Sequence, residues 1–104
     1  MGKIKWTEKA ISNLQAVYDY ISRDSKIYAT RFIKSLIYAT LKLEEMPRCG
    51  RIVPELKEYG FREVIFRNYR IVYRVIEGSN DVEILAVVHC VRDFETVFSQ
   101  EREL

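Results

Sequence analysis

Cysteine, histidine and long apolar runs are scarce in this 104-residue sequence. The two cysteines, Cys49 and Cys90, are too few for a zinc site or a disulfide framework, so we expect free thiols and neither a metal nor another cofactor. No apolar run approaches the roughly 18 residues of a membrane span. The first residues also lack the apolar core of a signal peptide. The sequence therefore predicts a cytoplasmic protein without a membrane partner.

What the chain does have is ample apolar material, since 48% of its residues are hydrophobic and seven are tyrosines. This composition predicts a single globular domain over residues 1–104. The net charge of +2 is too small to indicate a nucleic-acid binder, and the chain alone is not expected to bind DNA. The charge is uneven, however, because residues 47–76 are rich in arginine and residues 77–104 are acidic. Any anion-binding face should therefore involve the middle of the chain.

The clearest pattern in that middle segment is a β-hairpin. Residues 61–66 read as one strand, and from Tyr69 onward alternate positions are apolar, which predicts a second strand with one dry face. Only Arg67 and Asn68 separate the strands, so the connection is a two-residue turn whose type the sequence leaves open. Tyr69 and Tyr73 fall on the dry face and are expected to be core residues with their hydroxyls at the rim. The hairpin should display four arginines on a rigid sheet: Arg62, Arg67, Arg70 and Arg74.

Two amphipathic helices are predicted before the hairpin. Thr7 is a suitable N-cap for the first helix, whose apolar spacing continues to about Arg23. Either Asp24 or Ser25 can cap the second helix, whose apolar stripe reaches Met46. Because the link between them is so short, the two helices should form an antiparallel pair.

The remaining segments complete an α+β fold. Residues 3–6 alternate like a short edge strand, residues 47–60 read as a crossing loop with two prolines, and residues 77–81 form a turn. The nearly continuous apolar run 82–91 predicts a strand covered on both faces, and residues 92–104 are expected to add a short helix or strap. The order predicts a short N-terminal strand and a helical hairpin packed on one face of a small antiparallel sheet, with a C-terminal three-stranded meander.

Several short motifs together resemble those of a known family. They are Met46-Pro47, GRIVPEL at residues 50–56, FRE at 61–63, NYRIVY at 68–73 and VHCVRD at 88–93. In this order and spacing they resemble the RelE/ParE superfamily, the small toxins of type II toxin–antitoxin systems, also called plasmid stabilisation proteins. The resemblance spans nearly the whole chain. It implies the strand-helix-helix-three-strand order described above and a cognate, ParD-like antitoxin as partner.

The superfamily contains two activities, which the motifs help to separate. RelE-like members cut mRNA in the ribosomal A site with basic residues and, in many, a C-terminal tyrosine, whereas ParE-like members are associated with poisoning DNA gyrase. Arg70 and Arg92 match two RelE-type arginines, and Arg62 stands where that group has a lysine. Val64 replaces a second lysine and Phe98 replaces the tyrosine, which removes a cation and a proton-transfer group. The GRIVPEL loop and the VHCVRD ending look more like ParE.

The resemblance therefore implies a ParE-like toxin that inhibits DNA gyrase, causes growth arrest and is neutralised by an antitoxin. The antitoxin would lay an acidic segment over the helical hairpin and the basic sheet face. One alternative is a RelE-like, metal-independent endoribonuclease acting on the ribosome and mRNA, and another is a non-toxic binding domain of an autorepressing complex. The binding candidates are Arg62, Arg67, Arg70, Arg74, Arg92 and Phe98. The catalytic candidates, if the protein is a nuclease, are Arg62, Glu63, Arg70, His89 and Arg92.

Each candidate also has a purely structural interpretation. Arg70 and Arg74 share a strand face, where arginines usually solvate an open surface or, here, pair with carboxylates of the C-terminal tail. His89 titrates in the right range for acid and base work, yet in so apolar a run it is more often a partly buried sheet residue. Glu63 is a candidate general base beside Arg62, although a cross-strand ion pair is the more ordinary role. Cys90 is expected to be an inert buried thiol.

Overall fold

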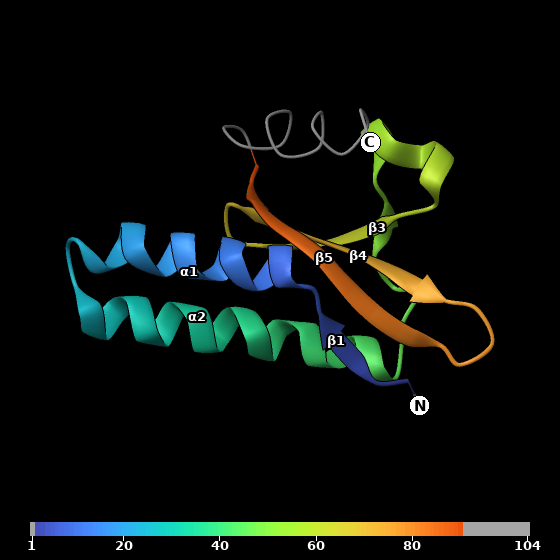
Figure 1. The fold of residues 1–104 in the computed structure, drawn as a ribbon, viewed down its shortest axis with the longest axis horizontal. Helices are drawn as coiled ribbons and strands as arrows, with labels where there is room; N and C mark the ends of the chain where they lie inside the picture. Colours follow the sequence, from blue (N-terminus) through green and yellow to red (C-terminus); the bar gives the residue numbers. More distant parts are fainter. Residues whose placement is uncertain (1, 91–104) are drawn as a thin grey trace.

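The computed structural model describes residues 2–90, which form a helical hairpin and a five-stranded sheet (Figure 1). The expected segment 92–104 and the candidates Arg92 and Phe98 lie outside the described residues. The elements, in chain order, are β1 Ile4–Trp6, α1 Glu8–Ser22, α2 Lys26–Thr40, the 3₁₀ helix η1 Leu41–Glu44, β2 Arg51–Ile52, the 3₁₀ helix η2 Pro54–Tyr59, β3 Arg62–Phe66, β4 Tyr69–Ile76 and β5 Asp81–His89.

The sheet has the strand order β1-β5-β4-β3-β2. β3, β4 and β5 form the predicted antiparallel meander, and the predicted edge strand is present as β1. The expectation of a purely antiparallel sheet is wrong, because β1 runs parallel to β5. Parallel neighbours need a long connection between them, and the helical hairpin is part of that connection. The α+β class is confirmed, with the sheet mixed rather than antiparallel.

Both helices begin at the predicted caps. The hydroxyl oxygen of Thr7 accepts a hydrogen bond from the backbone N–H of Ala10 at 3.1 Å, and that of Ser25 accepts one from Tyr28 at 3.1 Å. Ser25 rather than Asp24 therefore caps α2. The helix ends at Thr40 and continues as η1, so the apolar stripe is shorter than predicted. Within residues 2–90 no helix is long and apolar enough to cross a membrane.

The sheet is buried on both faces. On the helical side the strands pack against residues such as Phe32 and Leu36, both almost fully buried. On the other side a smaller cluster contains Val53, Leu56, Val72, Ala86 and Val88. The prediction that β5 is apolar on both faces is confirmed. Between the pairs Val72–Ala86 and Tyr73–Ile84 the register shifts, which marks a β-bulge in this region of β4 and β5.

The segment predicted as a plain crossing loop contains two further elements. β2 adds a fifth strand at the sheet edge, and η2 covers the second face with the buried side chain of Leu56. Pro54 occupies the first turn of η2, where its missing N–H costs nothing, and Gly60 ends it with a φ of 72°. A two-residue strand has no period to detect, so sequence patterning missed it.

The β3–β4 turn is the predicted two-residue connection. Arg67 adopts a φ of 54°, and Asn68 is not among the described residues with positive φ. Arginine adopts a positive φ less readily than asparagine does. The guanidinium of Arg67 lies 5.5 Å from the ring centre of Phe66 and 6.0 Å from that of Phe32, within reach of cation–π attraction.

Candidate functional site

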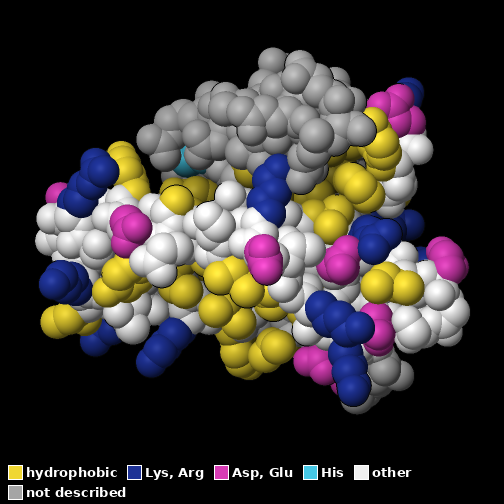
Figure 2. All heavy atoms as spheres, in the orientation of Figure 1, with side chains coloured by type: hydrophobic (Ala, Val, Ile, Leu, Met, Phe, Trp, Pro, Cys, Tyr) yellow, Lys and Arg dark blue, Asp and Glu magenta, His cyan; other side chains and the backbone are white. Residues whose placement is uncertain are grey.

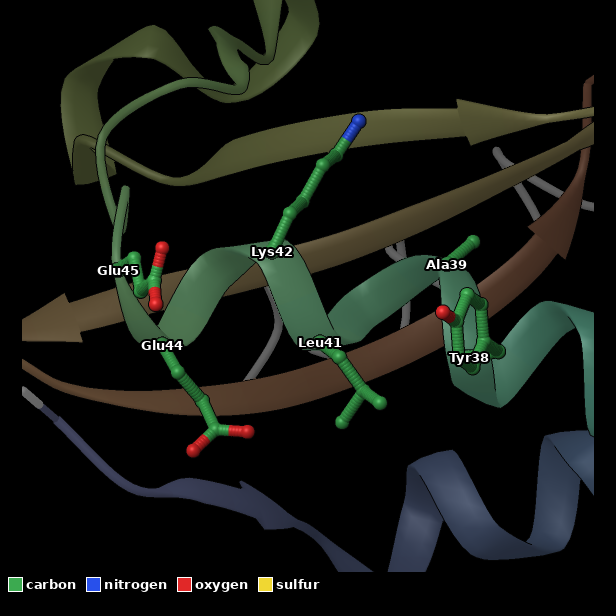
Figure 3. A pocket seen from close by; sticks show the side chains of 6 residues that line it. All are labelled: Tyr38, Ala39, Leu41, Lys42, Glu44 and Glu45. Atoms are coloured by element: carbon green, nitrogen blue, oxygen red, sulfur yellow. The ribbon is translucent and has the colours of Figure 1, made fainter.

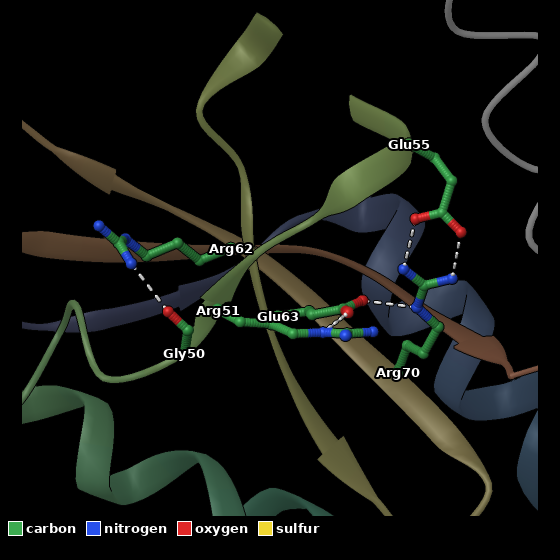
Figure 4. A network of polar contacts seen from close by, with 6 residues as sticks. All are labelled: Gly50, Arg51, Glu55, Arg62, Glu63 and Arg70. Carbon is green, nitrogen blue, oxygen red and sulfur yellow. Dashed lines mark hydrogen bonds and ion pairs between the residues drawn. The ribbon is translucent and has the colours of Figure 1, made fainter. Parts of the chain in front are cut away.

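The side chain of Arg70 lies at the centre of an ion-pair network on the sheet face opposite the helices (Figure 4). Its Nε donates to Glu63 Oε1 at 2.5 Å, and its two Nη atoms donate to the two carboxylate oxygens of Glu55 at 3.0 and 2.8 Å. The residue is only 6% exposed. The expectation that Arg70 stands on an open sheet face is therefore wrong, because η2 brings Glu55 over it.

The network neutralises its own charges. Glu63 also accepts a hydrogen bond from Arg51 Nε at 2.5 Å, so two arginines meet two carboxylates. The hydrogen bond from Arg70 holds the pKa of Glu55 down at about 2, and the same contact raises the pKa of Arg70 above its usual range. Glu55 and Arg70 are thus ionised at neutral pH. An anion could bind Arg70 only by displacing a carboxylate from it.

Glu63 takes the structural role considered for it, but with different partners. Its side chain is 0% exposed, and it pairs across the strands with Arg51 and Arg70. Arg62 does not contact it, because successive residues of a strand point to opposite faces. Instead, Arg62 Nη1 donates to the carbonyl oxygens of Gly50 at 2.8 Å and of Arg48 at 3.3 Å.

Tyr69 and Tyr73 are core residues as predicted, with 6% and 0% exposure. The hydroxyl of Tyr73 is not at the rim, however, since it accepts a hydrogen bond from the buried N–H of Gly50 at 3.0 Å. Burial raises the pKa of the Tyr73 phenol. A Cβ on residue 50 would lie 2.6 Å from the same hydroxyl and 2.5 Å from the carbonyl oxygen of Glu63. Only glycine fits this close approach.

His89 is the partly buried sheet residue that the sequence suggested. Its Nε2 lies 3.4 Å from Asn68 Nδ2, and its ring meets Tyr69 edge-on at 5.4 Å. Arg74, in contrast, is half exposed and pairs with Glu83 at 2.7 Å. Cys49 and Cys90 are free thiols, with Cys49 exposed and Cys90 half-buried rather than buried.

The described nuclease candidates do not converge on one point. Glu63 and Arg70 lie on the face opposite the helices, whereas His89 pairs with Tyr69 on the helical side. Arg62 pairs with Tyr73 of β4, whereas His89 pairs with Tyr69, four residues away on the same strand. Four strand residues span about 13 Å, so Arg62 and His89 are separated by about this distance along the strand direction. Within residues 2–90 there is also no group of three or more acidic, histidine or cysteine side chains suited to a metal.

Sequence reasoning missed Arg51 and Glu55 as members of the site. The two-residue hairpin turn fixes the register of β3 against β4 and puts Glu63 diagonally beside Arg70 on one face of the sheet. The pair of Glu63 with Arg70 could therefore be predicted from the sequence. The pair of Glu55 with Arg70 could not, because the position of Glu55 depends on how η2 folds back over the sheet.

The family of the chain follows from its sequence. Residues 4–94 match the sequence model of the family described as the ParE toxin of the type II toxin-antitoxin system, parDE. The chain belongs to this toxin family. The resemblance to the RelE/ParE superfamily inferred from the motifs is thereby confirmed.

Known relatives of the toxin agree with this assignment. It is 33% identical over 93 residues to Toxin RelE2 of Caulobacter vibrioides, an alignment that covers 88% of this chain and 99% of the relative. The chromosomal ParDE system of P. aeruginosa has the same fold, with a TM-score of 0.69, 23% identity, and coverage of 86% and 96% of the two chains. The toxin–antitoxin complex RelBE2 of Mycobacterium tuberculosis gives a TM-score of 0.63 at 21% identity, covering 85% and 96%.

Proposed function

We propose that this toxin acts by binding DNA gyrase and not by cleaving mRNA. The observation that carries the proposal is the neutralised state of Arg70, whose Nε and two Nη atoms donate to Glu63 and Glu55. A ribonuclease needs cations that remain available to the developing charge on the phosphate. An arginine with a 6% exposed surface and two carboxylate partners does not meet that need.

The proton carriers also argue for a binding function. Glu63 is 0% exposed and bonded to two arginines, so its carboxylate does not reach a ribose hydroxyl. His89 lies on the other face of the sheet, with its ring against Tyr69. A general acid and a general base must both lie within hydrogen-bond reach of the reacting group. A toxin that acts by binding requires neither, and the parDE description of its family supports this choice.

A cognate antitoxin is the second part of the proposal. The family belongs to type II toxin-antitoxin systems, and the solved RelBE2 relative is a complex of toxin with antitoxin. Helix α2 carries only basic charges, and Lys26 and Arg31 are exposed in its first half. An acidic antitoxin segment suits that half of the helix together with Arg67 at the hairpin tip. Such a complex would assemble in the cytoplasm, where gyrase works.

One observation favours the RelE-like alternative. The relative with 33% identity is named Toxin RelE2, and its alignment spans nearly the whole of both chains. Under this alternative the toxin is a ribosome-dependent endoribonuclease, and target binding would have to release Arg70 from Glu55.

A paired assay distinguishes the two activities. Purified toxin is added to a gyrase supercoiling reaction and, separately, to a translating extract in which mRNA cleavage is mapped. We expect inhibited supercoiling and no codon-dependent cleavage, with the toxin–antitoxin complex as the inactive control. In cells, blocked DNA replication should precede any fall in protein synthesis. Rapid cleavage in the ribosomal A site, abolished by His89→Ala, would make the nuclease alternative correct.

A further inference from the structure

The second half of α2 and η1 carry an exposed surface that the proposed function does not use. We call it the Tyr38 face and define it by Lys34, Tyr38, Leu41, Glu44 and Glu45. Tyr38 is 75% exposed and Leu41 45% exposed, and Figure 2 shows hydrophobic side chains gathered over α2. The ion pairs within residues 2–90 involve other side chains, so the three charges of this face are uncompensated there.

Tyr38 stands as a ridge between two hollows of similar size. One hollow, of about 500 Å³, lies toward Lys34 and Phe66. The other, of about 490 Å³, lies toward Leu41, Lys42, Glu44 and Glu45 (Figure 3). A protruding aromatic ring next to an open hollow is the shape that one helix needs to interlock with another.

The charges of the Tyr38 face are polarised along the helix. Lys34 is at one end, and at the other end the two acidic residues Glu44 and Glu45 outnumber the basic residue Lys42. In Figure 3, Leu41 and Glu44 point in the same direction while Lys42 points away from them. Leu41 and Glu44 point the same way because η1 has three residues per turn, so that side chains three residues apart lie one above the other.

We propose that the Tyr38 face is the contact surface for a second copy of this chain, related by a twofold axis between Tyr38 and Leu41. With a rise of about 1.5 Å per residue in α2 and about 2.0 Å in η1, Lys34 and Glu44 each lie about 8 Å from that axis. Each lysine therefore falls opposite a glutamate of the other copy. Each Tyr38 enters the hollow beside Leu41 of the other copy, as a twofold contact requires.

The charge pattern selects this occupant over others. Two parallel copies would place lysine against lysine and glutamate against glutamate. An acidic antitoxin segment would suit the Lys34 end but would be repelled by Glu44 and Glu45 at the opposite end. A surface with the reverse order of charges satisfies both ends, and an antiparallel copy of the same helix supplies it. The contact covers about three turns of helix, so the dimer is expected to be weak and reversible.

Sedimentation velocity on the full chain made by cell-free synthesis tests the proposal, over a range of about 1 to 200 μM suited to a small interface. We expect a monomer–dimer equilibrium within this range. Lys34→Glu should raise the dimer dissociation constant at least about tenfold, and Glu44→Lys with Glu45→Lys should do the same. All three changes together should restore it to within about threefold of the original value, because the reversed charges pair again.

Matched variants separate the contact from general effects. Tyr38→Ala should weaken the dimer at least about tenfold, as expected for a central aromatic anchor. Tyr20→Ala and Lys26→Glu, which change exposed residues outside the Tyr38 face, should leave the dissociation constant unchanged. Circular dichroism melting checks that each variant is folded.

Three outcomes would overturn the proposal. The first is a monomer at every concentration, and the second is a combined charge reversal that fails to restore the dimer. The third is a Lys34→Glu variant that keeps the dimer but loses antitoxin binding, because the surface would then belong to the antitoxin. The result is independent of the gyrase and translation assays, so either proposal can fail without the other.

Discussion

At the scale of single residues, Arg70 is fixed by two carboxylates from different elements. Glu63 comes from the neighbouring strand β3 and Glu55 from η2, which lies over the sheet. Such a buried network is weak evidence for high stability, because removing charges from water is costly. Removing Arg70 alone is nevertheless destabilising, since the buried carboxylate of Glu63 then loses one of its two arginines.

The first prediction concerns Arg70→Ala. Because Glu63 is 0% exposed and would keep only its pair with Arg51, we expect unfolding free energy to fall by about 3 to 5 kcal/mol in urea denaturation. Arg74→Ala is the matched control, and its half-exposed pair with Glu83 should cost less than about 1 kcal/mol. Unchanged stability with weakened target or antitoxin binding would instead favour the contact role predicted from the sequence.

The second prediction concerns pH. The pKa of Glu55 is lowered from 4.5 to about 2 in the folded protein, chiefly by its hydrogen bond from Arg70. A lowered folded pKa contributes stability that is present above the unfolded value and is lost as pH falls from about 4.5 toward 2. Because the side chain is 45% exposed, solvent screening reduces this contribution to on the order of 1 kcal/mol.

Glu55→Gln should therefore flatten the acid limb of the stability curve. Urea unfolding is measured at steps from pH 5 down to pH 2 for both proteins. The variant should be less stable than the parent near neutral pH, and the difference should shrink below pH 4.5. Parallel curves over this interval would contradict the ionic role of Glu55.

At the scale of elements, the two helix caps are similar in sequence but different in their surroundings. Both accept a hydrogen bond from the N–H three residues ahead. The Thr7 hydroxyl also lies 3.0 Å from the carbonyl oxygen of Ile84 and 3.3 Å from that of Leu85, as a donor. Thr7 thus ties the start of α1 to strand β5, whereas Ser25 caps only its own helix.

The third prediction compares these caps. Ser25→Ala should cost about 1 kcal/mol, the usual loss for a helix N-cap. Thr7→Ala should cost about 1 kcal/mol more, because the hydroxyl that donates to the carbonyl oxygens of Ile84 and Leu85 is lost as well. Chemical denaturation of the two variants measures the difference. Equal losses would mean that the bonds to β5 add nothing to the cap.

The elements with many periodic residues could be predicted from the sequence. The helices and the meander repeat their pattern over eight or more residues in α1, α2, β4 and β5, so chance matches are few. β2 could not be predicted, because its two residues are defined only by their pairing with β3. The parallel position of β1 likewise depends on where the chain returns after the hairpin. For the site, the sequence supplied Arg70 and Glu63, but it did not supply Glu55, which tertiary folding brings to them.

At the scale of the whole molecule, the fourth prediction concerns growth. Expression of the toxin alone should arrest a bacterial culture, and co-expression of its antitoxin should restore growth, because the proposed complex would cover the surface that meets the target. Colony counts and growth curves measure both effects. Normal growth with confirmed soluble toxin would favour the non-toxic binding domain of an autorepressing complex.

The pairing of β1 with β5 determines when, during synthesis of the chain, the sheet can close. Thr7 bonds to Ile84, which follows it by 77 residues, and within residues 2–90 β1 has its register partners only in β5. At a synthesis rate of about 5 to 20 residues per second, β1 waits about 4 to 15 seconds for β5 to be made. The sheet cannot close before the end of this interval. An antitoxin that recognises the closed sheet would therefore bind the toxin only after β5 has been made.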